Sequence, residues 1–451
     1  MHGTKIGFTS LLACPRCDKP LADLSCIACQ VDFPVRDGVP WLFAEPDAAM
    51  TEWHNRWQLA LANLNQDKKR VRAAIGKNSD PQTLVRLELL QRGYVEQKKC
   101  LTRLLEPLGL HAQADLETHL ALKTRPPTQQ GLFTYVANLH RDWCWGEEEN
   151  QFGFAAIKAA LQGIEPDKIL VLGAGAARLA YDLHQSLESA ITVALDFNPL
   201  LVYAATNIIN GNPVTLWEFP LAPKRSEDVA IQRILSAPDP VREGFYYVLG
   251  DALRAPFKPG QFDAVITPWF IDVVEEAPAK MIPRINLLLD HGGVWINYGS
   301  LAFDQANPAN RLSLPEFISL STHCGFTDIE AVEATVPYMN CPDSRHGRLE
   351  DVVTIRAVKQ TDASQPERHQ ALPDWIVNGK RPVPLTQSFQ SQATITRIHA
   401  YIMSLIDGKR TLEDMAGMLE QQKLMQKAAA TSAIRGFLIT MFEEQGSGRG
   451  Y

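Results

Sequence analysis

An apolar run that ends in two closely spaced glycines constrains the fold of this chain more than any other stretch. Residues 168–172 read as a buried strand, and Gly173 and Gly175 form a tight turn after it. Apolar residues at helical spacing then begin at Leu179. Small residues at such a turn let a cofactor approach the backbone and the N-terminus of the following helix. Ala177 stands where a dinucleotide-binding turn has its third glycine, so the turn alone does not identify the cofactor.

The residues around this turn predict an α/β domain with a mostly parallel sheet. Apolar stretches that read as strands alternate with helical patterns. Besides 168–172, strands are expected at 191–196, 246–252, 262–272, 294–297, 327–332 and 352–358, the last two as an antiparallel closing pair. A doubly wound sheet of this kind binds its ligands beyond the carboxyl ends of the strands.

Two acidic residues follow predicted strands. Asp196 ends the second strand about 20 residues after the glycines, which is the spacing of a carboxylate that binds ribose hydroxyls. A turn residue or helix cap is the alternative for Asp196. Gly250 and Asp251 end the third strand. A dehydrogenase shares the first two strands but explains neither this Gly-Asp pair nor the closing hairpin. The order is similar to that of class I S-adenosyl-L-methionine (SAM) methyltransferases, so we expect their Rossmann-like sheet.

The region from Arg141 to Val358 resembles the carnosine N-methyltransferase family. The resemblance covers about half of the chain and rests on phrases that occur in the family's order. These phrases are Leu139–Gly146, Gly173–Ala180, Trp269–Asp272, Trp295–Leu301 and Leu314–Phe326. The resemblance implies an enzyme that transfers a methyl group from SAM to nitrogen.

Three positions depart from the family pattern. Ala177 replaces a glycine, and Asp196 stands where the family has a glutamate. Asp304 occupies the place of a family histidine that belongs to the carnosine site. The resemblance therefore supports methyl transfer more strongly than it supports carnosine as the acceptor.

By resemblance, the SAM contacts lie in the glycine turn and beside the ends of the first four strands. An acid after the third strand meets the adenine amino group in methyltransferases, which assigns that role to Asp251. Arg141 is expected to reach the methionine carboxylate, with a surface ion pair as the alternative, and Arg178 is expected either to hold the same carboxylate or to pair structurally. The predicted SAM-binding residues are Arg141, Gly173, Gly175, Arg178, Asp196, Asp251, Ala252 and Pro268.

Asp272 is the predicted catalytic residue. Methyl transfer from a sulfonium is an in-line displacement, so the protein mainly positions a neutral nucleophile and excludes water. At the ligand edge of the sheet, the Asp272 carboxylate can accept a hydrogen bond from one imidazole nitrogen and leave the other nitrogen facing the methyl group. A helix N-cap is the alternative. The predicted substrate residues are Trp269, Phe270, Asp272, Tyr298 and Asp304.

Four of the eight cysteines form two C-x-x-C pairs near the N-terminus. Cys14 and Cys17 make the first pair, and Cys26 and Cys29 make the second. Two such turns complete a tetrahedral zinc shell, and four sulfur ligands leave no open position, so the predicted zinc is structural. Disulfides or free thiols are the alternative. The flanking sequence resembles the zinc ribbon of small methyltransferase-activator proteins.

The chain divides into five predicted segments. These are a zinc ribbon (1–46), a helical segment (47–150), the SAM-dependent methyltransferase domain (151–360), a linker (361–384) and a small, mostly helical C-terminal domain (385–451). In the last segment, residues 405–415 resemble the PqqD-like winged-helix module, which binds a leader peptide in peptide-modifying systems. An oligomerisation or packing domain is the alternative.

Composition narrows the class of function. The net charge of −7 gives no support to nucleic-acid binding. We find neither an apolar stretch long enough to span a bilayer nor a signal peptide, so the cytoplasm is the expected location.

The sequence predicts an N-methyltransferase that uses SAM and acts on a small imidazole- or amine-containing compound or on a peptide. A methyltransferase-like scaffold without catalysis is one alternative, and an RNA or protein methyltransferase is another. A protein partner is a further expectation, through the zinc ribbon or through the C-terminal module.

Overall fold

The structure is a computed structural model of the chain, and it describes residues 7–109, 131–365, 373–377 and 380–447. Two compact units are present, Met1–Gln370 and Ala371–Tyr451. The first unit contains the cysteine module, the helical segment and the central sheet, whereas the described part of the second contains only helices. Within the described residues, no helix has both the length and the apolar character that crossing a membrane requires.

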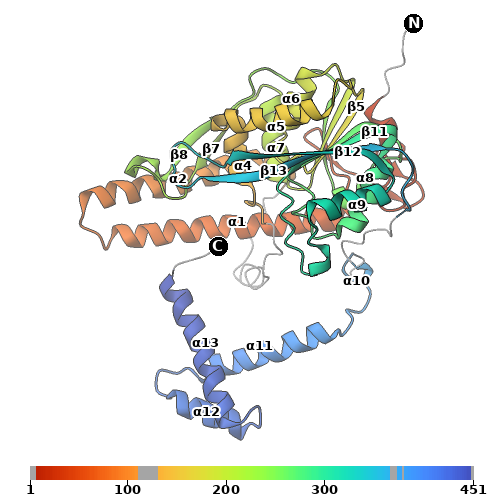
Figure 1. The fold of residues 1–451 in the computed structure, drawn as a ribbon. Helices are drawn as coiled ribbons and strands as arrows, with labels where there is room; N and C mark the ends of the chain where they lie inside the picture. Colours follow the sequence, from red (N-terminus) through yellow and green to blue (C-terminus); the bar gives the residue numbers. More distant parts are fainter. Residues whose placement is uncertain (1–6, 110–130, 366–372, 378–379, 448–451) are drawn as a thin grey trace. The chain divides into compact units, whose positions relative to one another are not determined.

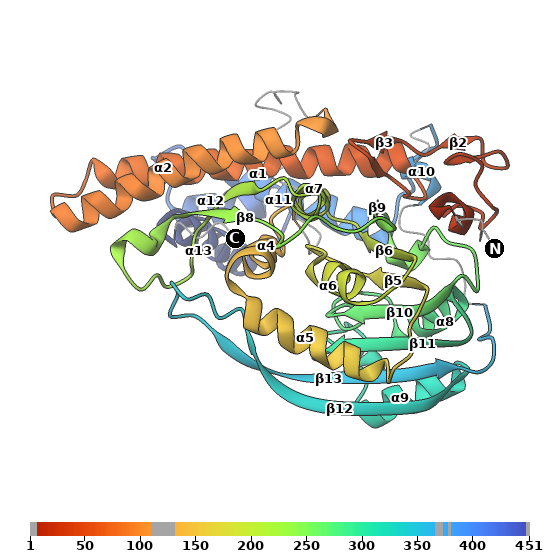
Figure 2. The same cartoon turned by 90° about the horizontal axis from the view of Figure 1, so that it is seen from above.

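A seven-stranded sheet forms the centre of the first unit (Figure 2). Its strands in spatial order are β12 (Phe326–Tyr338), β13 (Arg348–Lys359), β11 (Leu289–Gly299), β10 (Phe262–Pro268), β5 (Lys168–Leu172), β6 (Ile191–Asp196) and β9 (Phe245–Leu249). Among these strands, β13 is the one that runs antiparallel to its neighbours. The predicted class I methyltransferase sheet with its antiparallel closing pair is confirmed.

Alternate residues of each central strand pack on opposite faces of the sheet. On β5, Ile169 and Val171 belong to one hydrophobic core, and Leu170 and Leu172 belong to the other. The first core also takes in apolar residues of α5 (Glu147–Ala160), α6 (Arg178–Ser186) and α7 (Pro199–Ile209). The second takes in those of α8 (Pro278–Leu288) and α9 (Leu314–His323). Burial on both faces explains why these strands read as continuous apolar runs.

Two long helices, α1 (Pro46–Ile75) and α2 (Pro81–Leu104), lie side by side (Figures 1 and 2). Trp53 and Trp57 of α1 and Leu101 of α2 are buried in the first core. Asp80 caps α2 by accepting a hydrogen bond from the Thr83 amide at 2.7 Å. The short helix α4 (Val136–His140) and a π-helical turn, η3 (Arg141–Trp145), then lead into α5.

A β-hairpin that the sequence analysis did not predict is inserted between α7 and β9. It consists of β7 (Val214–Glu218) and β8 (Ile231–Leu235). Its two strands lie outside the central sheet, and β7 is bonded to α2 through the Trp217 amide, which donates to the Gln97 side chain at 2.7 Å. Four short 3-10 turns complete the middle of the chain: η2 (Glu106–Leu108), η4 (Ser226–Val229), η5 (Ala252–Arg254) and η6 (Pro308–Asn310).

The cysteine module is built from very short elements. These are η1 (Phe8–Leu11), β1 (Ser25–Cys26), β2 (Val31–Asp32), β3 (Val35–Arg36) and β4 (Val39–Pro40). Two two-stranded ribbons result, β1 with β2 and β3 with β4. Leu11, Leu12 and Phe33 are buried in the second core of the sheet, so the module shares that core.

The second unit contains α10 (Asp374–Val377), α11 (Gln387–Leu405), α12 (Leu412–Gln421) and α13 (Lys427–Ser447). The small core formed by the last three helices includes Ile402, Met415 and Ile434. Thr411 and Asp414 form a capping box at the start of α12. No strand is found in the described part of this unit, so the structure lends no support to a winged-helix module there.

Candidate active site

The loops that follow five parallel strands form the candidate site. Strands β5, β6, β9, β10 and β11 run in the same direction, so their carboxyl ends lie at one edge of the sheet. Most of the residues predicted to bind SAM or the acceptor lie in the loops at this edge. This is the edge at which sheets of this kind bind ligands.

The turn after β5 has the backbone that the glycines predict. Gly173 and Gly175 have positive φ angles of 67° and 57°, and Ala177 adopts the same left-handed conformation at 61°. A Cβ on Gly173 would lie 2.5 Å from Cδ2 of Phe270, so no larger residue fits there. At Gly175 a Cβ would meet no atom within 4 Å, which leaves this face of the turn open to a ligand. Ala177 is the buried N-cap of α6.

Asp196 ties the glycine turn to the end of β6. One carboxylate oxygen, Oδ2, accepts from the Gly175 amide at 2.8 Å, and Oδ1 accepts from the Asn198 amide at 2.9 Å. The side chain is only 6% exposed, and this burial raises the pKa of Asp196 to about 6 against the lowering effect of the amides. The structure thus brings together the turn and the acid that sequence spacing had paired.

Two aromatic side chains that the sequence analysis missed hold the carbonyls of the same turn. The Tyr247 hydroxyl donates to the carbonyl of Gly175, and Trp143 Nε1 donates to the carbonyl of Ala176 at 2.8 Å. Burial raises the pKa of Tyr247 well above its usual value, so the hydroxyl remains a donor. Tyr247 lies within a predicted strand, but no sequence signal showed what its hydroxyl contacts.

Asp251 caps the short turn η5 after β9. Its Oδ1 accepts from the Leu253 amide at 2.8 Å, and Ala252 is the first residue of that turn. The Gly250 amide donates to the Asp196 carbonyl at 3.0 Å, which places the ends of β6 and β9 beside each other. The predicted cofactor acids, Asp196 and Asp251, therefore follow neighbouring strands.

The turn after β10 places three predicted residues at the same edge. Pro268 pairs with Tyr298 of β11 at the ends of the two strands. Trp269 has a positive φ of 49°, and its amide donates to the Tyr298 carbonyl at 2.6 Å. Phe270 is buried against the glycine turn, where it packs on Gly173.

Asp272 is held at one of its two carboxylate oxygens. Oδ2 accepts from the Ser300 hydroxyl at 2.6 Å and from the Ala302 amide at 3.1 Å. The side chain is 9% exposed. Within the described parts of the chain, no hydrogen bond to Oδ1 is found, so this oxygen is available as an acceptor. Ser300 and Ala302 follow β11 and have no motif that would have indicated this contact.

An aromatic group lies next to the β10 turn. The Trp269 ring is 4.6 Å from the Tyr338 ring and 5.8 Å from the Tyr298 ring between centroids. Tyr298 is 5% exposed and also packs against Gly153 of α5, so it connects Trp269 to that helix. Tyr338, at the end of β12, was not predicted. Burial raises the pKa of Tyr135. The charges of the nearby Tyr338, Asp272 and Asp196 raise it further.

Residues 121–345 match the family described as carnosine N-methyltransferase, a match of just under half of the chain. This match agrees with the strand order and with the loops described above, and together they indicate the class of protein. The domain is a SAM-dependent N-methyltransferase. No curated protein matches the chain significantly.

Two solved methyltransferases show how far the likeness of this domain extends. Phosphoethanolamine N-methyltransferase 2 of Haemonchus contortus, solved with SAM, is 16% identical, with 52% of this chain and 59% of that chain covered and a TM-score of 0.35. The N-methyltransferase NodS of Bradyrhizobium japonicum, solved with S-adenosylhomocysteine (SAH), is 13% identical, with 50% and 99% covered and a TM-score of 0.33. The chain thus spans less than two thirds of the phosphoethanolamine enzyme. These scores are low, and the fold assignment of the methyltransferase domain rests on its strand order.

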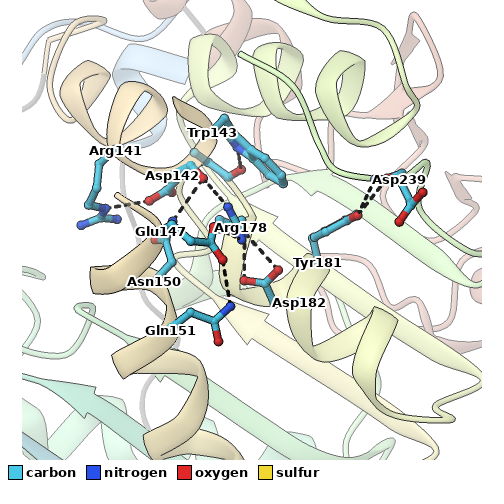
Figure 3. A network of polar contacts seen from close by, with 11 residues as sticks. Arg141, Asp142, Trp143, Glu147, Asn150, Gln151, Arg178, Tyr181, Asp182 and Asp239 are labelled. Atoms are coloured by element: carbon cyan, nitrogen blue, oxygen red, sulfur yellow. Dashed lines mark hydrogen bonds and ion pairs between the residues drawn. The ribbon is translucent and has the colours of Figure 1, made fainter. Parts of the chain in front are cut away.

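Both arginines of the predicted carboxylate site are paired with acidic side chains (Figure 3). Arg178 donates to Asp182 at 2.9 Å, to Glu147 at 2.8 Å and to the Asp142 carbonyl at 2.8 Å. Three groups of the chain thus accept hydrogen bonds from its guanidinium. This is structural pairing, which the sequence analysis gave as the alternative to holding the methionine carboxylate.

Arg141 is paired differently from Arg178. It donates to Asp142 at 2.7 Å and to Glu149 of α5 at 3.0 Å. Glu149 in turn accepts from the Met339 amide at 2.8 Å, so Arg141 is anchored beside the end of β12. No hydrogen bond from Arg141 Nη2 is found among the described residues. A pocket of about 270 Å³ lies between this group and residues 236–238, which follow β8.

Asp304 is the predicted substrate residue that the structure does not bring to the other four. Its side chain is fully exposed, and it reaches Arg311 at 3.9 Å. The preceding residue, Phe303, is buried against Phe317 of α9, which turns the chain so that Asp304 faces solvent. Asp304 therefore has no contact with Asp272 in this structure.

The four cysteines of the N-terminal module meet as predicted. Their sulfur atoms all lie within 4.8 Å of one another, with 4.0 Å between Cys14 and Cys29 and 3.5 Å between Cys17 and Cys26. Zinc bound tetrahedrally at about 2.3 Å from sulfur separates its ligands by roughly 3.8 Å, so these distances fit zinc. Burial raises the pKa of the Cys14 thiol. A bound cation would lower this pKa again, because it stabilises the thiolate.

Proposed function

We propose that the methyltransferase methylates a nitrogen of a small imidazole- or amine-containing compound, or of a peptide, with Asp272 as the residue that orients the acceptor. The observation that carries this proposal is the carboxylate of Asp272, which is buried at the ligand edge with one oxygen anchored and the other available. We place the reaction in the cytoplasm, as the sequence predicts.

For SAM, we propose the contacts that the sequence predicts at the strand ends. Asp196 and Asp251 would accept hydrogen bonds from the ribose hydroxyls and the adenine amino group, and Ala252 and Pro268 would line the site. The open face of Gly175 leaves room for the cofactor next to the backbone. Arg141, whose Nε and Nη1 donate to Asp142 and Glu149, would hold the methionine carboxylate through Nη2. Arg178 supports this group by fixing the carbonyl of Asp142.

SAM supplies the activated methyl group, and the chain supplies position and proton control. Asp272 Oδ1 would accept a hydrogen bond from one N–H of the acceptor and so fix the lone pair of the reacting nitrogen. Ser300 and the Ala302 amide keep that carboxylate from rotating. Trp269 and Phe270 exclude water from the same edge, which favours a neutral nucleophile.

Aromatic rings define the character of the acceptor. Trp269, three residues before Asp272, packs against Tyr338, and aromatic rings of this kind bind amines and planar heterocycles. The family matched by residues 121–345 is named for carnosine, but Asp304 stands in place of the family histidine and is exposed here. We therefore propose an acceptor other than carnosine.

A screen of imidazole compounds, primary and secondary amines and short peptides, with SAM labelled in its methyl group, tests the proposal. We expect label on a nitrogen of a compound from one of these classes and no transfer by Asp272→Ala. Label on RNA or on folded protein alone would overturn the acceptor class. An unchanged rate in Asp272→Ala would overturn the role of Asp272.

A further inference from the structure

The cysteine module is joined to the loop that carries Asp251 at three places. The first is the end of β9, where Trp41 forms a parallel bridge with Leu249 and the Leu42 amide donates to the Leu249 carbonyl at 2.7 Å. The chain after β4 thus extends the central sheet at its β9 edge. A Cβ on Gly250 would lie 3.2 Å from the Leu42 carbonyl oxygen, so this close approach depends on the glycine before Asp251.

The second contact lies on the other side of the loop. The Ala13 amide donates to the Pro256 carbonyl at 2.9 Å, and the Lys258 amide donates to the Leu11 carbonyl at 2.9 Å. Residues 11–13 therefore pair with residues 256–258. The loop from Gly250 to Lys258 is held at both ends by the module that contains the four cysteines.

The third contact reaches into the predicted metal site. Arg254, the last residue of η5, donates through its guanidinium to the carbonyl of Pro15. Pro15 lies between Cys14 and Cys17, in the first C-x-x-C turn. Asp251 caps η5 through the Leu253 amide, so the predicted adenine contact and the anchored arginine belong to one three-residue turn and its cap.

We propose that Arg254 is a positioning residue that couples metal binding at the four cysteines to SAM binding at Asp251. Zinc held by Cys14 and Cys17 would fix the carbonyl of Pro15, and Arg254 would pass that restraint to η5. Loss of the metal would free the turn and weaken SAM binding at a distance from the cofactor. This inference rests on the proposed function, because it takes Asp251 as the adenine contact.

Substitutions that leave the four cysteines intact give the first test. With zinc bound, we expect Arg254→Met to weaken SAH binding about tenfold, because the buried carbonyl of Pro15 loses its donor and η5 its anchor. Arg254→Lys keeps one donor and should recover most of the affinity. Lys258→Met is the matched control, because Lys258 Nζ donates to the Ser10 carbonyl at 2.6 Å and so joins the same segments outside the metal turn. Calorimetry with SAH and the zinc content of each variant are the measurements.

Removal of zinc by a chelator gives the second test. We expect wild-type protein to lose SAH affinity and Arg254→Met to lose little more, because its link is already cut. Equal SAH affinity of zinc-loaded wild type and Arg254→Met would overturn the coupling, and that comparison decides the question even if the stripped protein unfolds. Zinc-loaded wild type that binds no SAH would instead contradict the proposed function.

Discussion

The Gly175 amide donates to Asp196 Oδ2 at 2.8 Å, so the turn that approaches the cofactor is held by the acid that is expected to bind its ribose. Both oxygens of this carboxylate already accept backbone amides, and the side chain is almost fully buried. The geometry of the turn and the charge of the site are therefore linked through one residue.

This link predicts a pH dependence of cofactor binding. Burial raises the pKa of Asp196 to about 6, so the carboxylate is ionised above that pH and protonated below it. Ribose hydroxyls donate best to the ionised form, so SAH affinity should be constant above pH 7 and fall by up to about tenfold per unit below pH 6. Asp196→Asn should bind weakly with no such dependence. Calorimetry between pH 5 and 8 would refute the assignment if wild type gave a flat profile.

The two glycines of the turn should respond differently to alanine. Gly173→Ala brings a Cβ against Phe270 and strains a positive φ, so we expect a loss of about 3 kcal/mol in the free energy of unfolding. Gly175→Ala meets no atom of the protein, so we expect a loss of only about 1 kcal/mol but a clear loss of SAH affinity. Urea denaturation and calorimetry on both variants measure the contrast, and equal effects on stability would contradict it.

Asp272→Asn should lower kcat/KM for the native acceptor by about 100-fold or more, because the acceptor loses a charged hydrogen-bond partner. Asparagine keeps an oxygen for Ser300 and the Ala302 amide, so SAH affinity should change by less than about twofold. Asp290→Asn is the control: Asp290 lies near the start of β11, away from the ligand edge, and bonds the His291 amide. A similar loss in both variants would show that Asp272 acts through general stability.

Tyr338 should contribute its ring and not its hydroxyl. Tyr338→Ala removes the partner of Trp269, so we expect KM for the acceptor to rise about tenfold with SAH affinity retained. Tyr338→Phe keeps the ring and should behave like wild type. Steady-state kinetics of the two variants test this, and equally impaired kinetics would assign the effect to the hydroxyl.

Much of the fold was predictable because it is encoded locally. Strands buried on both faces leave continuous apolar runs, and tight turns between them need glycine, so β5, β6 and β10 were found from the sequence. The hairpin of β7 and β8 was not found, because both strands are only five residues long and polar residues interrupt their apolar runs. The pairing of Cys14 and Cys17 with Cys26 and Cys29 was predictable, since ligand spacing within each turn is a local property.

The sequence by itself determined which acids follow which strands. It also determined that these acids lie at one edge of the sheet, because parallel strands bring their carboxyl ends together whatever lies between them. Only the tertiary structure decided what those acids contact. Far-apart residues are joined where Tyr247 reaches the glycine turn, where the Met339 amide donates to Glu149 and where Arg254 reaches Pro15. Such contacts depend on how whole elements pack, and no local pattern records them.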